Sequence, residues 1–113
     1  MAKTYNLKRM IMSKLREVSR FCPARKEILK RAKVATNSYR CIQCNLLFIG
    51  KGIKADHIEP VVPVTGFTDW QDIIERFGFE NIEKWQALCY LCHQKKTNYE
   101  NEQRRLHKRL AAA

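Results

Sequence analysis

Cys89-Tyr90-Leu91-Cys92-His93 is the stretch that decides the fold of this chain, together with Cys41-Ile42-Gln43-Cys44. Each stretch holds two cysteines in a C-x2-C spacing, and 44 residues separate the two pairs. Two such pairs predict a four-thiolate cage around one zinc ion, because each pair curls a backbone loop around the metal. The predicted ligands are Cys41, Cys44, Cys89 and Cys92. A cage with four protein ligands is full, so we expect a structural ion there and any catalysis beside it.

Other roles for the cysteines explain their spacing less well. A redox role for a C-x-x-C pair is the competing interpretation, but it does not explain why the chain has two. The fifth cysteine, Cys22, is expected to be a small buried or half-buried thiol without a chemical role. The N-terminus lacks the apolar core of a signal peptide, and no apolar run approaches the ~20 residues that cross a membrane. We therefore expect a protein of the cytoplasm, where thiols stay reduced and bind metal.

The positive charge of the chain is concentrated at its N-terminal end. The formal net charge is +11, and residues 1–33 hold 11 Lys or Arg residues against 2 acidic ones. Such a segment predicts a polyanionic partner, most commonly nucleic acid. The residues expected to contact DNA here are Arg25, Lys26, Lys30 and Arg31. A solvated basic face without a partner is the alternative.

The order of elements predicts an α+β fold in one domain. Apolar spacing predicts a helix over about residues 5–19, and Pro23 suits the start of a second one. The remaining expected elements are a connector at 34–38, a hairpin of 46–49 with 53–58, a helix from a capping box at Thr68 to Gly78, and a terminal helix over 93–110. Residues 1–38 would form a basic helical extension packed on a core of residues 39–110, and Ala111–Ala113 look like residues added by cloning.

Asp56 and His57 lie between the cysteine pairs, and His93 directly follows the last cysteine. Closing the cage should therefore bring a carboxylate and two imidazoles together. A carboxylate is a suitable ligand for Mg²⁺ or Mn²⁺, and an imidazole can take a proton from water. Adjacent strand residues point to opposite faces, so one of the two must reach the site from an irregular strand end. A surface Asp-His pair without a chemical role is the alternative, and His93 could instead replace a thiolate on zinc.

The cysteine pairs, Asp56-His57-Ile58-Glu59-Pro60 and Leu88-Cys89-x-x-Cys92-His93-x-x-Lys96-Thr97 together resemble the HNH endonucleases. The similarity covers residues 39–97 and is greatest to the small zinc-bearing enzymes of phages and mobile elements. It implies a ββα-metal unit, in which a hairpin and a helix hold one divalent ion and cut DNA to leave 5′-phosphate ends. A bacterial cytoplasm, with a phage as the source of the gene, is the expected setting.

The resemblance also implies a role for each matching residue. His57 would be the general base, while Asp56 and His93 would bind the catalytic Mg²⁺ or Mn²⁺. The four cysteines would hold structural zinc, and Lys95 and Lys96 would face the DNA backbone. The family usually has an asparagine where this chain has Lys84. Asn81, three residues earlier, is therefore expected to brace the hairpin loop in its place.

Three functions remain open on the sequence. The first is a DNA endonuclease or nickase. The second is a zinc-stabilised DNA-binding or regulatory protein without useful catalysis, and the third is an interaction module whose basic surface meets an acidic protein. The presence of Asp56, His57 and His93 favours the nuclease, because a purely structural protein has no chemical need for all three.

Overall fold

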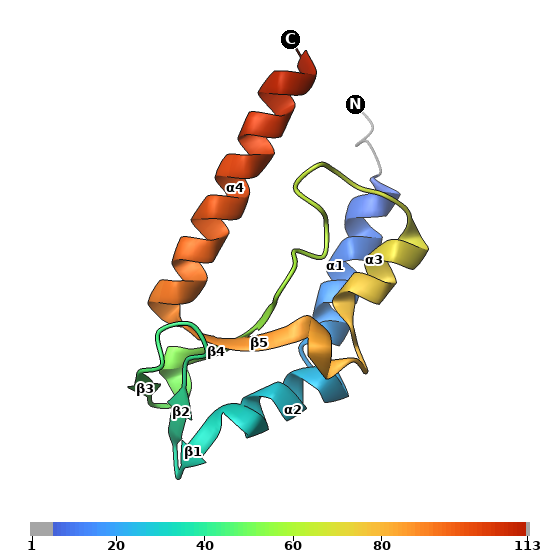
Figure 1. Cartoon of the computed structure of the whole chain (residues 1–113). Helices are drawn as coiled ribbons and strands as arrows, with labels where there is room; N and C mark the ends of the chain where they lie inside the picture. Colours follow the sequence, from blue (N-terminus) through green and yellow to red (C-terminus); the bar gives the residue numbers. More distant parts are fainter. Residues whose placement is uncertain (1–5, 113) are drawn as a thin grey trace, which may run out of the picture.

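The structure, a computed structural model, describes residues 6–112, which form a mixed fold of helices and small antiparallel sheets (Figure 1). The helices are α1 (Leu7–Ser19), α2 (Pro23–Ala32), α3 (Trp70–Phe77) and α4 (Tyr90–Ala112). One sheet contains β1 (Lys33–Ala35), β2 (Ser38–Arg40) and β3 (Leu47–Phe48), and the other pairs β4 (Ile53–His57) with β5 (Trp85–Cys89). Two 3₁₀ helices, η1 (Gly50–Gly52) and η2 (Ile82–Lys84), precede β4 and β5. The α+β class is as predicted.

The two N-terminal helices lie where the sequence predicted them. The side chain of Asn6 caps α1 by accepting a hydrogen bond of 3.0 Å from the backbone N–H of Arg9. Met12 and Leu15 lie on the inner face of α1 and pack against a buried cluster that contains Phe77. Helix α2 begins at Pro23, whose missing N–H costs nothing in the first turn of a helix.

The predicted hairpin of residues 46–49 with 53–58 is wrong. β3 pairs with β2, and β4 pairs with β5 over the full length from Ile53↔Cys89 to His57↔Trp85. The glycines at 50 and 52 lie in η1, which carries the chain from one sheet to the other instead of folding it back. Ile53 and Cys89 are buried in the same cluster, so burial of apolar side chains favours the long-range pairing.

Two further boundaries differ from the sequence prediction. Residues 34–38, expected to be a connector, are mostly the facing ends of β1 and β2, joined through a turn in which Asn37 has a φ of 52°. Asparagine adopts this left-handed backbone more readily than most residues, which permits the tight turn. The last helix begins at Tyr90 rather than at His93, so His93 lies in its first turn.

Helix α3 lies in the long segment that connects β4 to β5, and a capping residue fixes each of its ends. The side chain of Asp69, rather than Thr68, caps α3 by accepting from the backbone N–H of Asp72 at 2.8 Å. Gly78 ends the helix with a φ of 56°, as predicted for a glycine at this position. A Cβ at Gly78 would lie 2.6 Å from the side chain of Lys84, so the close approach also requires glycine.

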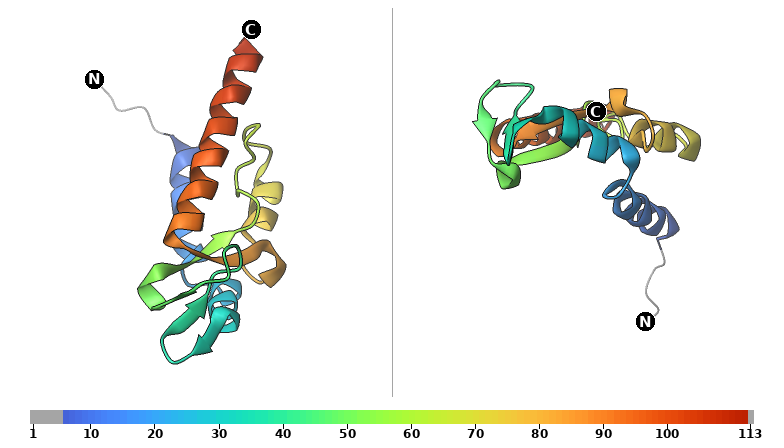
Figure 2. Two further views of the ribbon diagram at one scale, coloured as in Figure 1. Left: turned by 60° about the vertical axis from the view of Figure 1, so that its left-hand side comes forward. Right: turned by 90° about the horizontal axis from the view of Figure 1, so that it is seen from below.

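The β4–β5 sheet separates the helices into two groups. Figures 1 and 2 show α1, α3 and α4 extending from one side of this sheet and α2 lying on the other side. α4 projects beyond the rest of the chain and accounts for a longest dimension of 53 Å, against 29 Å in the other two directions. Over residues 6–112, no helix combines the length and apolar character that a membrane span requires.

Candidate functional site

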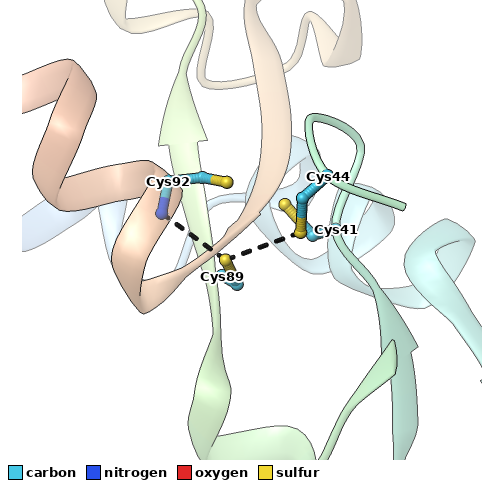
Figure 3. Close-up of side chains that lie close together, drawn as sticks. All are labelled: Cys41, Cys44, Cys89 and Cys92. Carbon is cyan, nitrogen blue, oxygen red and sulfur yellow. Dashed lines mark hydrogen bonds between the residues drawn. The ribbon is translucent and has the colours of Figure 1, made fainter. Parts of the chain in front are cut away.

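The four predicted zinc ligands come together from the loop between β2 and β3, the end of β5 and the first turn of α4. Their sulfur atoms all lie within 4.8 Å of one another, and the Cys44 and Cys89 sulfurs are 3.9 Å apart (Figure 3). Four sulfurs at Zn–S distances of about 2.3 Å form a tetrahedron with edges of about 3.8 Å. The spacing therefore fits one metal ion such as zinc, as the C-x2-C pairs predicted.

Backbone geometry shapes both cysteine loops. In the first loop, Asn45 has a φ of 62°, and its N–H donates to the carbonyl oxygen of Cys41 at 2.9 Å. In the second, the N–H of Cys92 points at the sulfur of Cys89 at 3.5 Å, which is the dashed line at the start of α4 in Figure 3. A donor directed at sulfur stabilises the thiolate, which is the form that binds metal.

The thiols of the cluster differ in acidity. Burial opposes ionisation of Cys41, but hydrogen bonds from the backbone of Cys44, Cys89 and Gln43 outweigh it and lower the pKa of this thiol to about 6. A hydrogen bond with Cys89, burial and the neighbouring sulfurs raise the pKa of Cys92 to about 12. Negative charges on adjacent sulfurs repel one another, and a divalent cation among them would remove this cost. The donor set thus fits zinc chemically as well as geometrically.

Cys22 lies outside this cluster. It is 4% exposed and packs with Ala24 and Trp85 between α2 and β5. The expectation of a small buried thiol is confirmed.

Asp56 and His93 meet beside the cysteine cluster, as predicted. Asp56 is near the end of β4, and its Oδ1 lies 3.5 Å from Nε2 of His93 in the first turn of α4. Gln86, opposite Asp56 on β5, donates a hydrogen bond of 3.1 Å to the other carboxylate oxygen. The Asp56 side chain is only 14% exposed, so these contacts hold it firmly toward α4.

Asp56 and His93 offer one carboxylate oxygen and one imidazole nitrogen 3.5 Å apart. Within the described residues 6–112, the four cysteines are the only group of three or more Cys, His, Asp or Glu ligands so closely spaced. An ion held by Asp56 and His93 would take its remaining ligands from water and phosphate. Mg²⁺ commonly binds in this way, through one or two protein side chains and a phosphate substrate.

The sequence predicted that Asp56 would meet two imidazoles, but of the two its carboxylate contacts only that of His93, and the contacts of the His57 imidazole are with Trp85 and Phe77. The His57 ring lies on Trp85 with centroids 3.9 Å apart, and its Nε2 is 2.9 Å from the carbonyl oxygen of Phe77. A carbonyl only accepts, so Nε2 carries the proton and Nδ1 keeps a free lone pair. Burial lowers the pKa of His57, against opposing contributions from the Phe77 carbonyl and the Asp56 charge. The ring is therefore neutral at pH 7 and able to accept a proton.

Lys96 is not directed at solvent as the resemblance implied. Its ammonium lies 3.1 Å from Asp56 and 3.0 Å from Glu100, and its side chain is 22% exposed. Two carboxylates thus neutralise Lys96, and it has no free charge to offer a phosphate. Lys95, the neighbouring residue, is exposed and stays a candidate for DNA contact.

The basic residues of α2 lie apart from Asp56 and His93. The side chain of Arg31 pairs with Glu27 at 3.3 Å, and that of Arg25 donates to the Arg20 carbonyl. Lys26 and Lys30 are exposed. Because α2 and α4 extend from opposite sides of the β4–β5 sheet (Figure 1), DNA held by α2 would have to pass around the sheet to reach His93.

Asn81 does not brace His57. Its side-chain oxygen accepts from the backbone N–H of Glu83 at 3.1 Å and so caps η2. The bracing comes instead from Phe77, through its carbonyl, and from the Lys84 carbonyl, which accepts from the Ile58 N–H at 2.9 Å. Sequence reasoning treated Phe77 and Trp85 as core residues only, and no sequence signal distinguished their second role.

Fold and site together define a mixed helix-and-sheet protein with a four-cysteine cluster that can bind a metal such as zinc. Comparison of the chain with protein-family models, with curated proteins and with solved structures finds no match.

Proposed function

We propose that this chain is a metal-dependent DNA endonuclease of the HNH type, with an active site formed by Asp56, His57 and His93. The observation that carries the proposal is the 3.5 Å approach of the Asp56 carboxylate to the His93 imidazole, between residues 37 positions apart in the chain. The cysteine cluster ties the two segments together, since Cys89 and Cys92 lie immediately before His93.

The arrangement of β4, β5 and α4 supports this assignment. Two antiparallel strands run directly into a helix, and the proposed ion ligands lie on the first strand and in the first turn of the helix. This is the order that the resemblance implies for a ββα-metal unit. The strands are separated by the long segment 58–84 rather than by a short turn, which is why the sequence suggested a different hairpin.

The chain's own residues provide the proton transfer. Nδ1 of His57 takes a proton from a water molecule, whose oxygen forms a bond to phosphorus while the bond from phosphorus to the 3′ oxygen breaks. The Nε2–H remains bonded to the Phe77 carbonyl, which holds the ring in place as it becomes positive. Asp56 and His93 would hold Mg²⁺ or Mn²⁺, which supplies positive charge for the phosphate and for the departing 3′ oxygen. The departing 3′ oxygen takes a proton from solvent water, so the products carry a 5′-phosphate and a 3′-hydroxyl.

A second candidate is a zinc-stabilised DNA-binding protein without useful catalysis. The ion pair between Lys96 and Asp56 favours it, because a protein cation at 3.1 Å competes with a divalent ion for this carboxylate. The replacement of the family asparagine by Lys84 points the same way.

Plasmid nicking separates the two candidates. We expect zinc-loaded protein to nick supercoiled DNA with Mg²⁺ or Mn²⁺ and EDTA to abolish the activity. His57→Ala should lower the rate by roughly 10² or more, the usual contribution of a general base. His107→Ala, at an exposed position of α4, is the matched control and should cut normally. Protein that binds DNA but never cuts with either ion would contradict the nuclease proposal and favour the second candidate.

A further inference from the structure

A groove of about 570 Å³ runs along α1, between this helix and the segment that links β4 to α3. α1 contributes three positive side chains to its lining, Lys8, Arg9 and Arg16, and no residue that lines it is acidic. Val62 and Phe67 belong to the opposite wall and make part of the lining apolar. The positive charge of residues 1–33 is evident in the sequence, but the groove itself forms only where α1 packs against the segment after β4.

Packing fixes the rotation of α1 about its axis. Met12 and Leu15 contact the buried cluster of Val61, Ile73 and Phe77, which turns the adjacent stripe of Arg9 and Arg16 toward the groove. Residues seven apart lie on nearly the same side of a helix, so both arginines face it together. The Lys8 ammonium lies 4.0 Å above the Phe67 ring and links the two walls.

The acidic residue of α1 is kept away from the groove. Glu17 forms an ion pair of 3.3 Å with Lys14, and both side chains are well exposed. Lys14 lies on the side of the helix opposite to Arg16, half a turn away. Among the described residues, neither Arg9 nor Arg16 takes part in an ion pair, so both positive charges are available to an anion.

The groove and His57 are linked through Phe77. Phe77, on whose cluster α1 packs, is also the residue whose carbonyl accepts the hydrogen bond from His57 Nε2 at 2.9 Å. Of the residues of α1 that line the groove, Arg16 is nearest to the C-terminal end of the helix. Cys22, just beyond this end, packs against Trp85, on whose ring His57 lies. Arg16 thus marks the end of the groove nearest the proposed general base.

We infer that the α1 groove binds the phosphodiester backbone of the DNA strand that is cut, with Arg16 nearest to the scissile phosphate. The inference rests on the proposed nuclease function and names the surface that feeds the site. Arg9 and Arg16 are separated by about 10.5 Å along the helix axis, at a rise of 1.5 Å per residue. Adjacent phosphates of one strand are closer together than this, so the two arginines would contact different phosphates.

Binding without cleavage tests this inference. The full zinc-loaded chain, without added Mg²⁺ or Mn²⁺, is titrated against a fluorescein-labelled DNA duplex of about 20 base pairs at several salt concentrations. We expect the double variant Arg9→Gln/Arg16→Gln to bind at least tenfold more weakly at low salt. The association constant falls as the salt concentration rises, and the steepness of log K against the log of salt concentration should decrease by about two. Each phosphate contact releases about one counterion, and the double variant loses two contacts.

Lys14→Gln is the matched control, since it removes the same charge from the same helix on the opposite face. We expect it to change the affinity less than threefold. A third variant, Ser13→Cys, places a thiol in the groove for attachment of an iron-EDTA reagent. The attached reagent should cut one strand of the duplex within a few nucleotides of the nick that the wild-type protein makes with Mg²⁺.

The outcomes separate this inference from the proposed function. If wild type nicks DNA but the double variant binds like Lys14→Gln, the groove inference is wrong and the nuclease stands. If the double variant loses affinity as expected while wild type never nicks, the groove holds DNA and the nuclease proposal fails. Scattered cleavage from the reagent at position 13 would also overturn the inference, because it would show no fixed strand in the groove.

Discussion

The ammonium of Lys96 lies 3.1 Å from Oδ2 of Asp56, so a cation of the protein itself shares the carboxylate that is proposed to bind metal. The same ammonium lies 3.0 Å from Glu100, one turn further along α4. The Asp56 and Glu100 side chains are 14% and 15% exposed, which keeps solvent screening low. Lys96 can therefore hold Asp56 in position and also reduce its affinity for a divalent ion.

Removal of this charge should strengthen ion binding. We expect Lys96→Met to bind Mn²⁺ about fivefold more tightly than wild type, equivalent to roughly 1 kcal/mol of removed repulsion. Titration of free Mn²⁺ by electron paramagnetic resonance measures this without any cleavage assay. Lys95→Met, which removes an exposed charge from the adjacent position, is the control and should leave the affinity unchanged. Weaker Mn²⁺ binding in Lys96→Met would mean that the lysine chiefly positions Asp56.

The cysteine cluster should be essential for folding. We expect Cys89→Ala to contain almost no zinc and to lose several kcal/mol of stability, because the binding energy of structural zinc is folding energy. Cys22→Ala removes an equally buried sulfur that is not a ligand and should cost only about 1 kcal/mol. Zinc per chain by atomic emission and thermal unfolding by circular dichroism give the comparison. A folded, metal-free Cys89→Ala would show that the cluster is dispensable.

Asn81 should matter for stability rather than for cutting. Its side chain caps η2, so we expect Asn81→Ala to cost about 1 kcal/mol of unfolding free energy. The nicking rate should stay within about threefold of wild type under conditions where the variant is folded. If the rate instead fell as far as in His57→Ala with unchanged stability, Asn81 would have the bracing role that the resemblance implies.

Local patterns predicted the helices well because their causes are local. Pro23 starts α2, and Gly78 ends α3 in the left-handed conformation that its sequence position suggested. The strands were predicted less well. The partner of β4 is β5, more than 25 residues away, and this choice depends on which apolar side chains can be buried together. Sequence patterns describe only residues close together in the chain, so they predicted that β4 pairs with the nearer segment, residues 46–49.

The sequence by itself determined the metal cluster and the meeting of Asp56 with His93. Two C-x2-C pairs complete the tetrahedral site of one zinc ion only when the two loops lie together. Their approach also brings His93, next to Cys92, close to the segment that contains Asp56. Only the tertiary structure decided how His57 is oriented, that Lys96 is neutralised by Asp56 and Glu100, and that α1 lines a basic groove with Val62 and Phe67. These features depend on how separate helices pack on the β4–β5 sheet. Charge and composition are the same whichever face of a helix is buried, so they could not distinguish these arrangements.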